Sequence, residues 1–432
     1  MNGSDIGWML ISTALVLLMT PAVGFFYTGL VRSKNALNTL MMSFVSLGFV
    51  GLVWALLGYS LAFAGGARFL GGLDHALLNG VGLEAKGTIP HVLFMAFQGT
   101  FAIITAALIS GAIVERMRFS AYIAFITLWS LVVYAPIAHW VWGGGWLAQF
   151  GALDFAGGTV VHITAGTAAW VAALMVGPRN DYARQALVPH SVPLTALGAG
   201  LAWFGWFGFN GGSALAANAQ AALAFVNTML APAATLAVWT AIDIVRTGKV
   251  TAVGVLTAMV VGLVAVTPAA GYISPLSGIA LGAIAAIPSY FAVQWRARTR
   301  LDDSLDVVSA HGVGGVIGAL MTGVLAQKAW GAPADGALFG NPAQLGIQAV
   351  AVLSAIAFTA VMTAGVLQLV RAAMGLRTAV PDESVGLDVT QHGEEAYGRE
   401  DGAILVLSKR RAPERPPADI LGPSLSMQGD RS

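Results

Sequence analysis

Residues 154–166 read DFAGGTVVHITAG, and residues 303–315 read DSLDVVSAHGVGG. In both segments a histidine, His162 or His311, lies eight residues after the first aspartate and four residues before the last glycine. The matched spacing indicates an internal repeat. The long apolar stretch that follows each histidine predicts that each copy opens a membrane-spanning helix.

The composition of the whole chain agrees with a membrane protein. Of 432 residues, 57% are hydrophobic and only 10% are charged, and the mean hydropathy is +0.75, whereas a soluble domain carries about 25% charged residues. The net charge of +1 argues against both an acidic solvating protein and a strongly basic nucleic-acid-binding protein. Because the chain has no cysteine, disulfides, thiolate catalysis and cysteine-ligated metal sites are excluded.

Intervals free of Asp, Glu, Lys and Arg predict the number of spans, since a spanning helix needs about 20 mostly apolar residues. Two long intervals, 185–242 and 250–295, each hold two spans, divided at Gly/Pro-containing breaks at 211–212 and 268–271. With the shorter intervals, we expect an all-α polytopic membrane protein with eleven transmembrane helices. The first 30 residues lack a basic region, so the first span is expected to be mature protein rather than a signal peptide.

Basic residues predict the orientation of these helices. With the N-terminus outside, eleven basic residues fall in cytoplasmic loops and only Arg68, Lys86 and Lys328 fall in exterior loops. The C-terminus is then inside. We expect a transmembrane domain over 1–375 and a cytosolic tail over 376–432, whose last part has the composition of a disordered segment.

This orientation makes the two histidine segments parts of an inverted repeat. Spans 1–5 and 6–10 would be related as a 5+5 repeat, with one extra helix, a plan that places a transport site near the membrane midplane. Eight residues of helix rise about 12 Å, so the two histidines would approach the middle of a core about 30 Å thick from opposite faces. Their depths would differ by about 6 Å, which allows a hydrogen bond between them.

A lumen-lining role for both histidines is favoured over a purely structural one, because intramembrane ionisable groups are costly. Metal binding is the weaker interpretation, since no further ligands accompany them. Asp154 is expected to cap the start of its helix with its carboxylate. The same capping role is expected for the aspartates before span 10, which are Asp302, Asp303 and Asp306.

The remaining histidines carry less information. His139 is interpreted as an interfacial or helix-packing residue, and no function is assigned to the histidines in or near loops, which are His75, His91, His190 and His392. Aromatic clusters at the exterior ends of spans allow two interpretations, an interfacial belt or a wall that attracts a small cation. They comprise Phe97 and Phe101; Trp140, Trp142 and Trp146; and Trp206 to Phe209.

Taken together, these segments resemble the ammonium transporter (Amt/Mep/Rh) family, and most closely its bacterial Amt branch. The resemblance extends over about residues 5–400 and rests on motifs that occur in the family's order. These motifs are FQGTF at 97–101, GAIVERMRF at 111–119, HWVWGGGW at 139–146, DFAGGTVVH at 154–162, WFGFNGGS at 206–213, 302–315, and GLDVTQHGEEAY at 386–397.

The resemblance implies a homotrimer with the ammonium transporter fold and one pore in each subunit. It assigns exterior recruitment of ammonium to Phe101, Trp142 and Ser213, and a stacked gate to Phe101 and Phe209. It further implies that His162 and His311 are a twin-histidine pair in an apolar lumen, and that Asp154 is a structural and electrostatic carboxylate.

These assignments imply a function. The protein would recruit NH4+, deprotonate it near the gate and conduct NH3, with or without the proton, through the lumen. No cofactor is expected. The resemblance places the protein in a bacterial cytoplasmic (inner) membrane, and its tail resembles the region through which relatives respond to a PII-type signal protein. The alternatives are an ammonium sensor with little flux, a tail that only stabilises the trimer, a gas channel, and a membrane enzyme, which lacks ligands.

Overall fold

The computed structural model describes residues 1–184 and 188–397, and eleven helices in these residues are long and apolar enough to cross a membrane. Short interruptions divide some of them into several elements. The spanning elements are α1 (Gly3–Leu30), α2 (Ala36–Val53) with α3 (Tyr59–Phe63), α4 (His91–Ile109), α5 (Phe119–Trp129) with α6 (Ala135–Val141) and α7 (Trp146–Phe150), α8 (Thr164–Val176), α9 (Val192–Gly212), α10 (Ala219–Thr247), α11 (Ala252–Val266), α12 (Pro275–Arg296), α13 (Gly314–Leu325) and α14 (Ala343–Met374). The predicted number of spans is confirmed.

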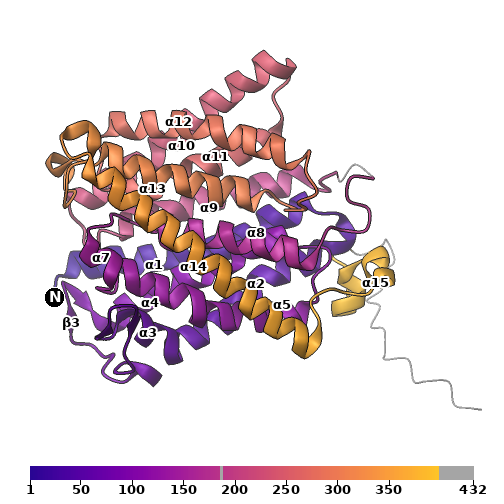
Figure 1. The fold of residues 1–432 in the computed structure, drawn as a ribbon, viewed down its shortest axis with the longest axis horizontal. Helices are drawn as coiled ribbons and strands as arrows, with labels where there is room; N and C mark the ends of the chain where they lie inside the picture. Colours follow the sequence, from indigo (N-terminus) through magenta and orange to yellow (C-terminus); the bar gives the residue numbers. More distant parts are fainter. Residues whose placement is uncertain (185–187, 398–432) are drawn as a thin grey trace, which may run out of the picture.

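The spanning helices pack as two similar halves. In the first half α1 packs against α2 and α4, and in the second half α9 packs in the same way against α10 and α11. The two halves join most extensively along α1 and α9. Figure 1 shows the first half below, the second half above, and α14 running obliquely across both. The arrangement agrees with two repeats of five spans and one extra helix.

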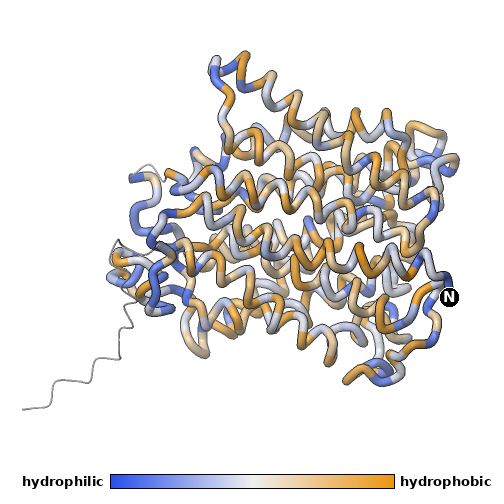
Figure 2. Tube along the Cα trace, turned by 180° about the vertical axis from the view of Figure 1, so that it is seen from behind, coloured by the Kyte–Doolittle hydropathy of each residue, from blue (hydrophilic) through white to orange (hydrophobic). Residues whose placement is uncertain are grey.

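Polar residues gather at the two ends of the bundle, while the helices between them are mainly apolar (Figure 2). Two small hairpins occupy one end, formed by β1 (Gly66–Ala67) with β2 (Leu70–Gly71) and by β3 (Ala85–Lys86) with β4 (Ile89–Pro90). The opposite end carries α15 (Val380–Val385) and the π-helical turn η11 (Asp388–His392). The sequence orientation would make the hairpin end exterior and the α15 end cytoplasmic.

Side-chain caps at several helix starts account for the positions at which the spans begin. Asn2, Ser191, Asn218, Thr251 and Ser274 each accept a hydrogen bond from a backbone N–H in the first turn of the helix that follows. These caps satisfy donors that have no partner within the helix.

The two histidine helices begin later than the sequence spacing suggested. The π-helical turn η6 (Gly158–Ile163) precedes α8, and η8 (Val308–Val313) precedes α13. Each histidine therefore lies about one turn into its helix, and the assumption of eight helical residues after Asp154 was wrong. Residues 155–157 lie outside any helix, and His162 and His311 meet through one hydrogen bond.

Residues 410–432, predicted to be disordered, lie outside the described residues. Within the described part, the chain leaves the bundle after α14, which ends at Met374, close to the domain boundary expected at residue 375.

Candidate functional site

A column of aromatic and imidazole rings runs from the hairpin end of the bundle into its centre. Trp142 meets Phe101 edge to face with 5.9 Å between ring centroids, and Phe101 lies 4.2 Å from Phe209. His162 follows with its ring 6.0 Å from that of Phe209, and His311 lies 5.3 Å beyond His162. Trp142 is half-buried, whereas the other rings are buried. The column therefore leads from the accessible surface at Trp142 to the interior of the protein, where the rings are buried by neighbouring side chains.

The polar hollow at the outer end of this column has a cavity volume of about 330 Å³. Its wall includes Phe101, Trp142 and Ser213, and also Phe63 and Phe94. We call this hollow the vestibule. The Ser213 hydroxyl donates its proton to the backbone carbonyl oxygen of Phe209 over 2.8 Å. Its oxygen lone pairs therefore remain available to accept a hydrogen bond from a cation.

Asp154 also contributes to the vestibule wall, yet its carboxylate is committed to the protein. One carboxylate oxygen accepts hydrogen bonds from the backbone N–H groups of Gly157 and Gly158, and the other from those of Thr159 and Val160. This is the capping geometry expected from the sequence. Burial raises the pKa of Asp154 to about 6, although the four N–H groups act in the opposite direction.

Asp154 also positions the vestibule through its backbone. The indole Nε1 of Trp142 donates a hydrogen bond of 2.9 Å to the carbonyl oxygen of Asp154. The residue that starts the His162 helix thus also fixes the orientation of the outermost ring of the column.

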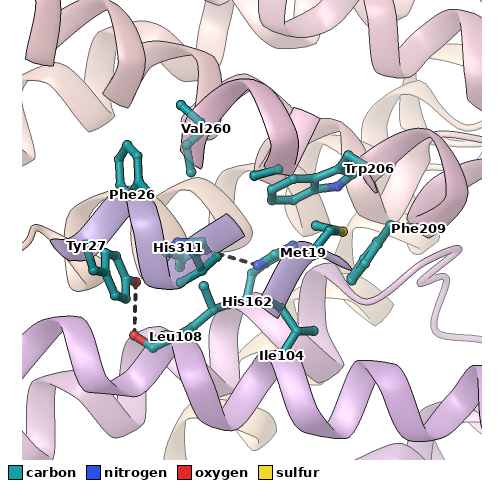
Figure 3. Close-up of a pocket in the computed structure, with 13 residues that line it drawn as sticks. Met19, Phe26, Tyr27, Ile104, Leu108, His162, Trp206, Phe209, Val260 and His311 are labelled. Atoms are coloured by element: carbon teal, nitrogen blue, oxygen red, sulfur yellow. Dashed lines mark hydrogen bonds between the residues drawn. The ribbon is translucent and has the colours of Figure 1, made fainter. Parts of the chain in front are cut away.

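Beyond the rings of Phe101 and Phe209 lies a narrow apolar cavity, shown in Figure 3. Its volume of about 20 Å³ is room for little more than one water-sized molecule. We call this cavity the lumen. His162 and His311 line it together with hydrophobic side chains and with Tyr27, whose hydroxyl donates to the carbonyl oxygen of Leu108. The imidazoles are therefore the principal polar groups exposed to the lumen.

The two imidazoles are joined by one hydrogen bond. The Nδ1 atoms of His162 and His311 lie 3.2 Å apart, so one of them carries the hydrogen and the other accepts it. No described residue provides a partner for Nε2 of His162, which is buried. An unpartnered buried ring nitrogen is costly unless a mobile species pairs with it.

Glycines bring the two histidines together. A Cβ atom on Gly166 would lie 2.3 Å from the Cα atom of Gly312, and one on Gly315 would lie 3.1 Å from the Cβ atom of His162. The glycine four residues after each histidine is thus the reason that the two helices can cross at close range.

Several lumen residues were given no pore role from the sequence, although Trp206 was noted there as part of an aromatic cluster. Trp206 stacks on His162 at 5.4 Å, and its Nε1 donates to Thr267 Oγ1 over 2.9 Å. Met19 and Val23 of α1 also line the lumen. The spacing of Met19 and Val23 at i and i+4 was the available signal, but every membrane helix in this chain offers such pairs.

Other aromatic and histidine residues near the vestibule have packing roles. His139 is buried, and its ring nitrogens contact the carbonyl oxygens of Ala62 and Ala67, which agrees with the packing interpretation. Trp140 is also buried, and its Nε1 donates to the carbonyl oxygen of Phe69. Among the described residues no group of three His, Asp or Glu side chains is arranged to hold a metal ion.

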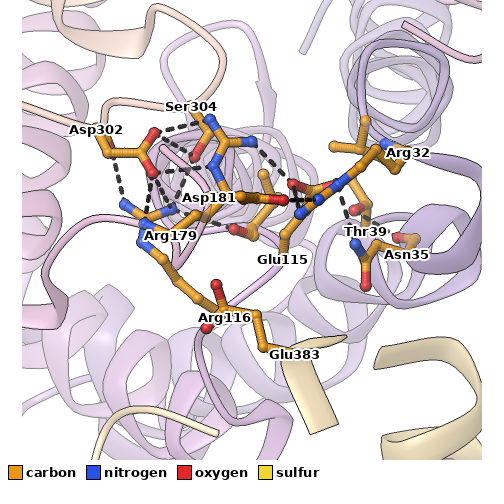
Figure 4. A network of polar contacts seen from close by, with 12 residues as sticks. Arg32, Asn35, Thr39, Glu115, Arg116, Arg179, Asp181, Asp302, Ser304 and Glu383 are labelled. Carbon is orange, nitrogen blue, oxygen red and sulfur yellow. Dashed lines mark hydrogen bonds and ion pairs between the residues drawn. The ribbon is translucent and has the colours of Figure 1, made fainter. Parts of the chain in front are cut away.

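A second polar cluster lies at the α15 end of the bundle and is shown in Figure 4. Glu115 forms ion pairs of 2.9 Å with both Arg32 and Arg179, and Arg179 also pairs with Asp302 at 2.8 Å. Burial alone would raise the pKa of Glu115, but the hydrogen bonds and charges of these arginines outweigh it and hold the pKa at about 2.

The aspartates of this cluster differ from the sequence expectation. Only Asp303 caps the helix start, accepting from the N–H groups of Val307 and Val308. Asp302 instead pairs with Arg179, and Asp306 pairs with Arg296 at 2.7 Å. Capping was therefore the wrong prediction for Asp302 and Asp306, because Arg179 and Arg296 supply charged partners for their carboxylates.

The tail docks against the same cluster. The carboxylate of Asp388 accepts hydrogen bonds from the first turn of α2, at the N–H groups of Leu37 and Asn38. Glu383 accepts from the N–H of Asn180 and pairs with Arg377 at 2.7 Å. The beginning of the tail is thus packed onto the first turn of α2 and onto the loop between α8 and α9.

Comparisons with known proteins place this geometry in context. The profile described as "Ammonium Transporter Family" matches residues 7–397. The chain is 45% identical to an ammonium transporter of Bacillus subtilis over 92% of its own length and 99% of that protein. It is 46% identical to ammonium transporter Amt1 of Archaeoglobus fulgidus over 92% of its own length and 100% of that protein.

Several solved structures share this fold. The chain is similar to a "Sensor Amt Protein" with a TM-score of 0.85 and 31% identity, covering 90% of this chain and 98% of that one. It is also similar to Saccharomyces cerevisiae Mep2 with a TM-score of 0.83 and 36% identity, covering 88% of this chain and 91% of that one.

Proposed function

This chain belongs to the Ammonium Transporter Family, and we propose that it takes up NH4+ at the vestibule, strips it of a proton at the stacked rings and conducts NH3 past the two histidines. Family membership and the eleven spanning helices in residues 1–184 and 188–397 identify a polytopic membrane protein of ammonium transport rather than an enzyme. The steps within the pore are the proposal.

Recruitment at the vestibule follows from its chemistry. The faces of Phe101 and Trp142 attract a cation, at about 0.5–2 kcal/mol for each ring. The Ser213 oxygen, whose proton is bound to the Phe209 carbonyl, accepts a hydrogen bond from the cation. Potassium has a similar size but no N–H group, so the hydroxyl favours ammonium over potassium.

The stacked rings and the small volume of the lumen behind them favour deprotonation of ammonium. Phe101 and Phe209 are in ring contact at 4.2 Å, and the lumen of about 20 Å³ offers an ion almost no water. A desolvated charge in such a cavity costs several kcal/mol. Neutral NH3 avoids most of this cost, which favours transfer of the proton from NH4+ to solvent water in the open vestibule before NH3 enters the lumen.

The single observation that carries the proposal is the unpartnered, buried Nε2 of His162. With one hydrogen shared between the two Nδ1 atoms, each neutral ring can act toward the lumen as a donor or an acceptor, depending on its tautomer. A passing NH3 can both accept and donate, so it satisfies the imidazoles in turn. The same pair is suited to relay a proton.

The test is ammonium transport by the purified protein in liposomes, comparing wild type with His162→Ala combined with His311→Ala. We expect the double variant to lose ammonium flux that is selective over potassium while it remains folded by thermal melting. Undiminished flux and selectivity in the double variant would refute the mechanism. In the wild type, a current would indicate that the proton follows, and internal alkalinisation without current would indicate neutral NH3.

A sensor is the second candidate function, and one observation favours it, namely the similarity to a structure named "Sensor Amt Protein". In that case the vestibule would bind ammonium and the docked tail would report it. Ammonium binding without current or alkalinisation would support the sensor.

We further propose a homotrimer in the cytoplasmic membrane whose tail binds a PII-type signal protein. The support for all three is the resemblance described above, together with bacterial relatives among the ammonium transporters. The tail is in a suitable position for control, since Asp388 binds the first turn of α2 and Glu383 binds the loop between α8 and α9.

A further inference from the structure

We infer that Lys86 sets the cation affinity of the vestibule: its charged amino group is a resident cation in a cage of aromatic rings, and it weakens the binding of external cations at that wall. This inference rests on the proposed function and concerns a residue outside the recruitment site, gate and histidine pair. Nothing in the spacing of the sequence singled out this lysine.

The cage consists of three rings around the Lys86 side chain. Nζ lies 4.9 Å from the ring centroid of Phe94, 5.6 Å from that of Tyr59 and 6.0 Å from that of Phe63. Phe63 and Phe94 are themselves packed edge to face, with their ring centroids 5.1 Å apart. These distances fall within the range in which a ring attracts a cation.

Two of the three rings are shared with the vestibule. Phe63 and Phe94 line the same hollow as Phe101, Trp142 and Ser213. A cation in the vestibule that approached Phe94 from its other side would lie about 10 Å from Nζ, given contact distances of about 5 Å on each side. The lysine therefore occupies the rings that an entering cation would otherwise use, and it adds a positive charge to that wall.

A directed chain of hydrogen bonds holds the lysine in place. Nζ donates to the Tyr59 hydroxyl oxygen over 3.2 Å, and the Tyr59 hydroxyl is 2.5 Å from Nε2 of His91. Nδ1 of His91 lies 3.0 Å from the carboxylate of Glu84, whose side chain is 56% exposed. The consistent assignment is donation from Lys86 to Tyr59, from Tyr59 to His91 and from His91 to Glu84.

These hydrogen bonds also give His91 a role, although its position in the sequence carried no functional signal. His91 is buried and connects the tyrosine to the carboxylate. Among the ion pairs of the described residues none involves Lys86, so the charge closest to the shared rings is not neutralised by direct contact.

The experiment measures the half-saturating ammonium concentration for flux in liposomes, in the wild type and in Lys86→Met. Methionine retains the length and apolar stem but removes the charge. We expect Lys86→Met to lower the half-saturating concentration two- to fivefold, as a charge about 10 Å away in a partly hydrated site would. The difference in half-saturating concentration between wild type and Lys86→Met should become smaller at high ionic strength. Lys86→Arg should stay close to wild type.

The matched control is Lys328→Met, which removes an exposed charge predicted to lie on the same exterior side. We expect it to leave the half-saturating concentration unchanged. Equal values for wild type and Lys86→Met would overturn the inference. If Lys86→Met fails to fold, Lys86→Gln takes its place, with the same expected shift and the same overturning result.

A second measurement separates this inference from the proposed function. Ammonium chloride titrated in a thermal-shift assay reports occupancy of the vestibule without any flux. Absence of flux in the wild type counts against the proposed transport. A lower dissociation constant in Lys86→Met would still support the role of the lysine, and an equal one would overturn it.

Discussion

Gly166 packs against Gly312 with no space for a side chain, since a Cβ atom on Gly166 would lie 2.3 Å from the Cα atom of its partner. Both residues lie beside the histidine pair, Gly166 one turn after His162 and Gly312 directly after His311. The hydrogen bond between the imidazoles thus depends on a backbone contact that only glycine permits.

Gly166→Ala is expected to separate the two helices and to lengthen the distance between the imidazoles. Overpacking of this kind costs about 1–3 kcal/mol, so the melting temperature should fall by several degrees and ammonium flux should fall at least tenfold. Thermal melting and liposome flux measure the two effects.

The control is Gly365→Ala on α14, where a Cβ atom would meet nothing within 4 Å. Alanine is a better helix former than glycine by up to about 1 kcal/mol, so this variant should be as stable as wild type or more so. Equal flux in the Gly166→Ala protein and in this control would show that the close crossing is not required for transport.

Ser213→Ala is expected to weaken ammonium recruitment while leaving the rings in place. The variant removes the oxygen that we propose accepts a hydrogen bond from the cation, and it also removes the hydrogen bond to the Phe209 carbonyl. A hydrogen bond to a charged group is worth about 1.5–3 kcal/mol, so the half-saturating ammonium concentration should rise about tenfold or more. Ser213→Thr retains the hydroxyl and should lie near the wild type; if alanine and threonine behave alike, the hydroxyl does not bind the cation.

The pH dependence of stability should report the buried cluster at the α15 end. The folded-state pKa of Glu115 is about 2, below its ordinary 4.5, so its ion pairs contribute stability above pH 4.5. That contribution is lost as the pH falls from 4.5 toward 2, and it amounts to about 3 kcal/mol. Melting curves at several pH values would measure the loss.

Glu115→Gln is expected to lower the melting temperature at pH 7 and to flatten its acid dependence. Asp303 is the internal contrast, because burial and the nearby Asp306 raise its pKa to about 7. Its ionisation therefore opposes folding as the pH rises from about 4 to 7, and Asp303→Asn should remove that opposite trend. If wild type and Glu115→Gln lose the same stability as the pH falls, groups other than Glu115 cause that loss.

The repeat was predictable because its two histidines and glycines have equal spacing in the two segments, and spacing along the chain can be read from the sequence without knowledge of the fold. The ion pairing of Asp302 was not predictable, since its partner Arg179 lies over a hundred residues away. The same holds for His91, whose partners Tyr59 and Glu84 come from a different span and a hairpin. The late helix starts were also missed, because π-helical turns depend on how the two helices cross.

The tail offers a final test, in which the chain is truncated after Arg377. This removes Glu383 and Asp388, which hold the loop at Asn180 and the first turn of α2. We expect binding of a PII-type protein to be lost, as measured by co-purification or calorimetry.

Substituting Tyr397, whose hydroxyl contacts His190 at 2.7 Å, with phenylalanine keeps the docked segment and serves as the milder variant. If truncation lowers the melting temperature or dissociates the oligomer but partner binding persists, the tail only stabilises the oligomer. If binding is lost while the oligomer and the basal flux are retained, the docked segment is the recognition element, because it contacts the first turn of α2 and the loop that follows α8, the helix that continues from His162.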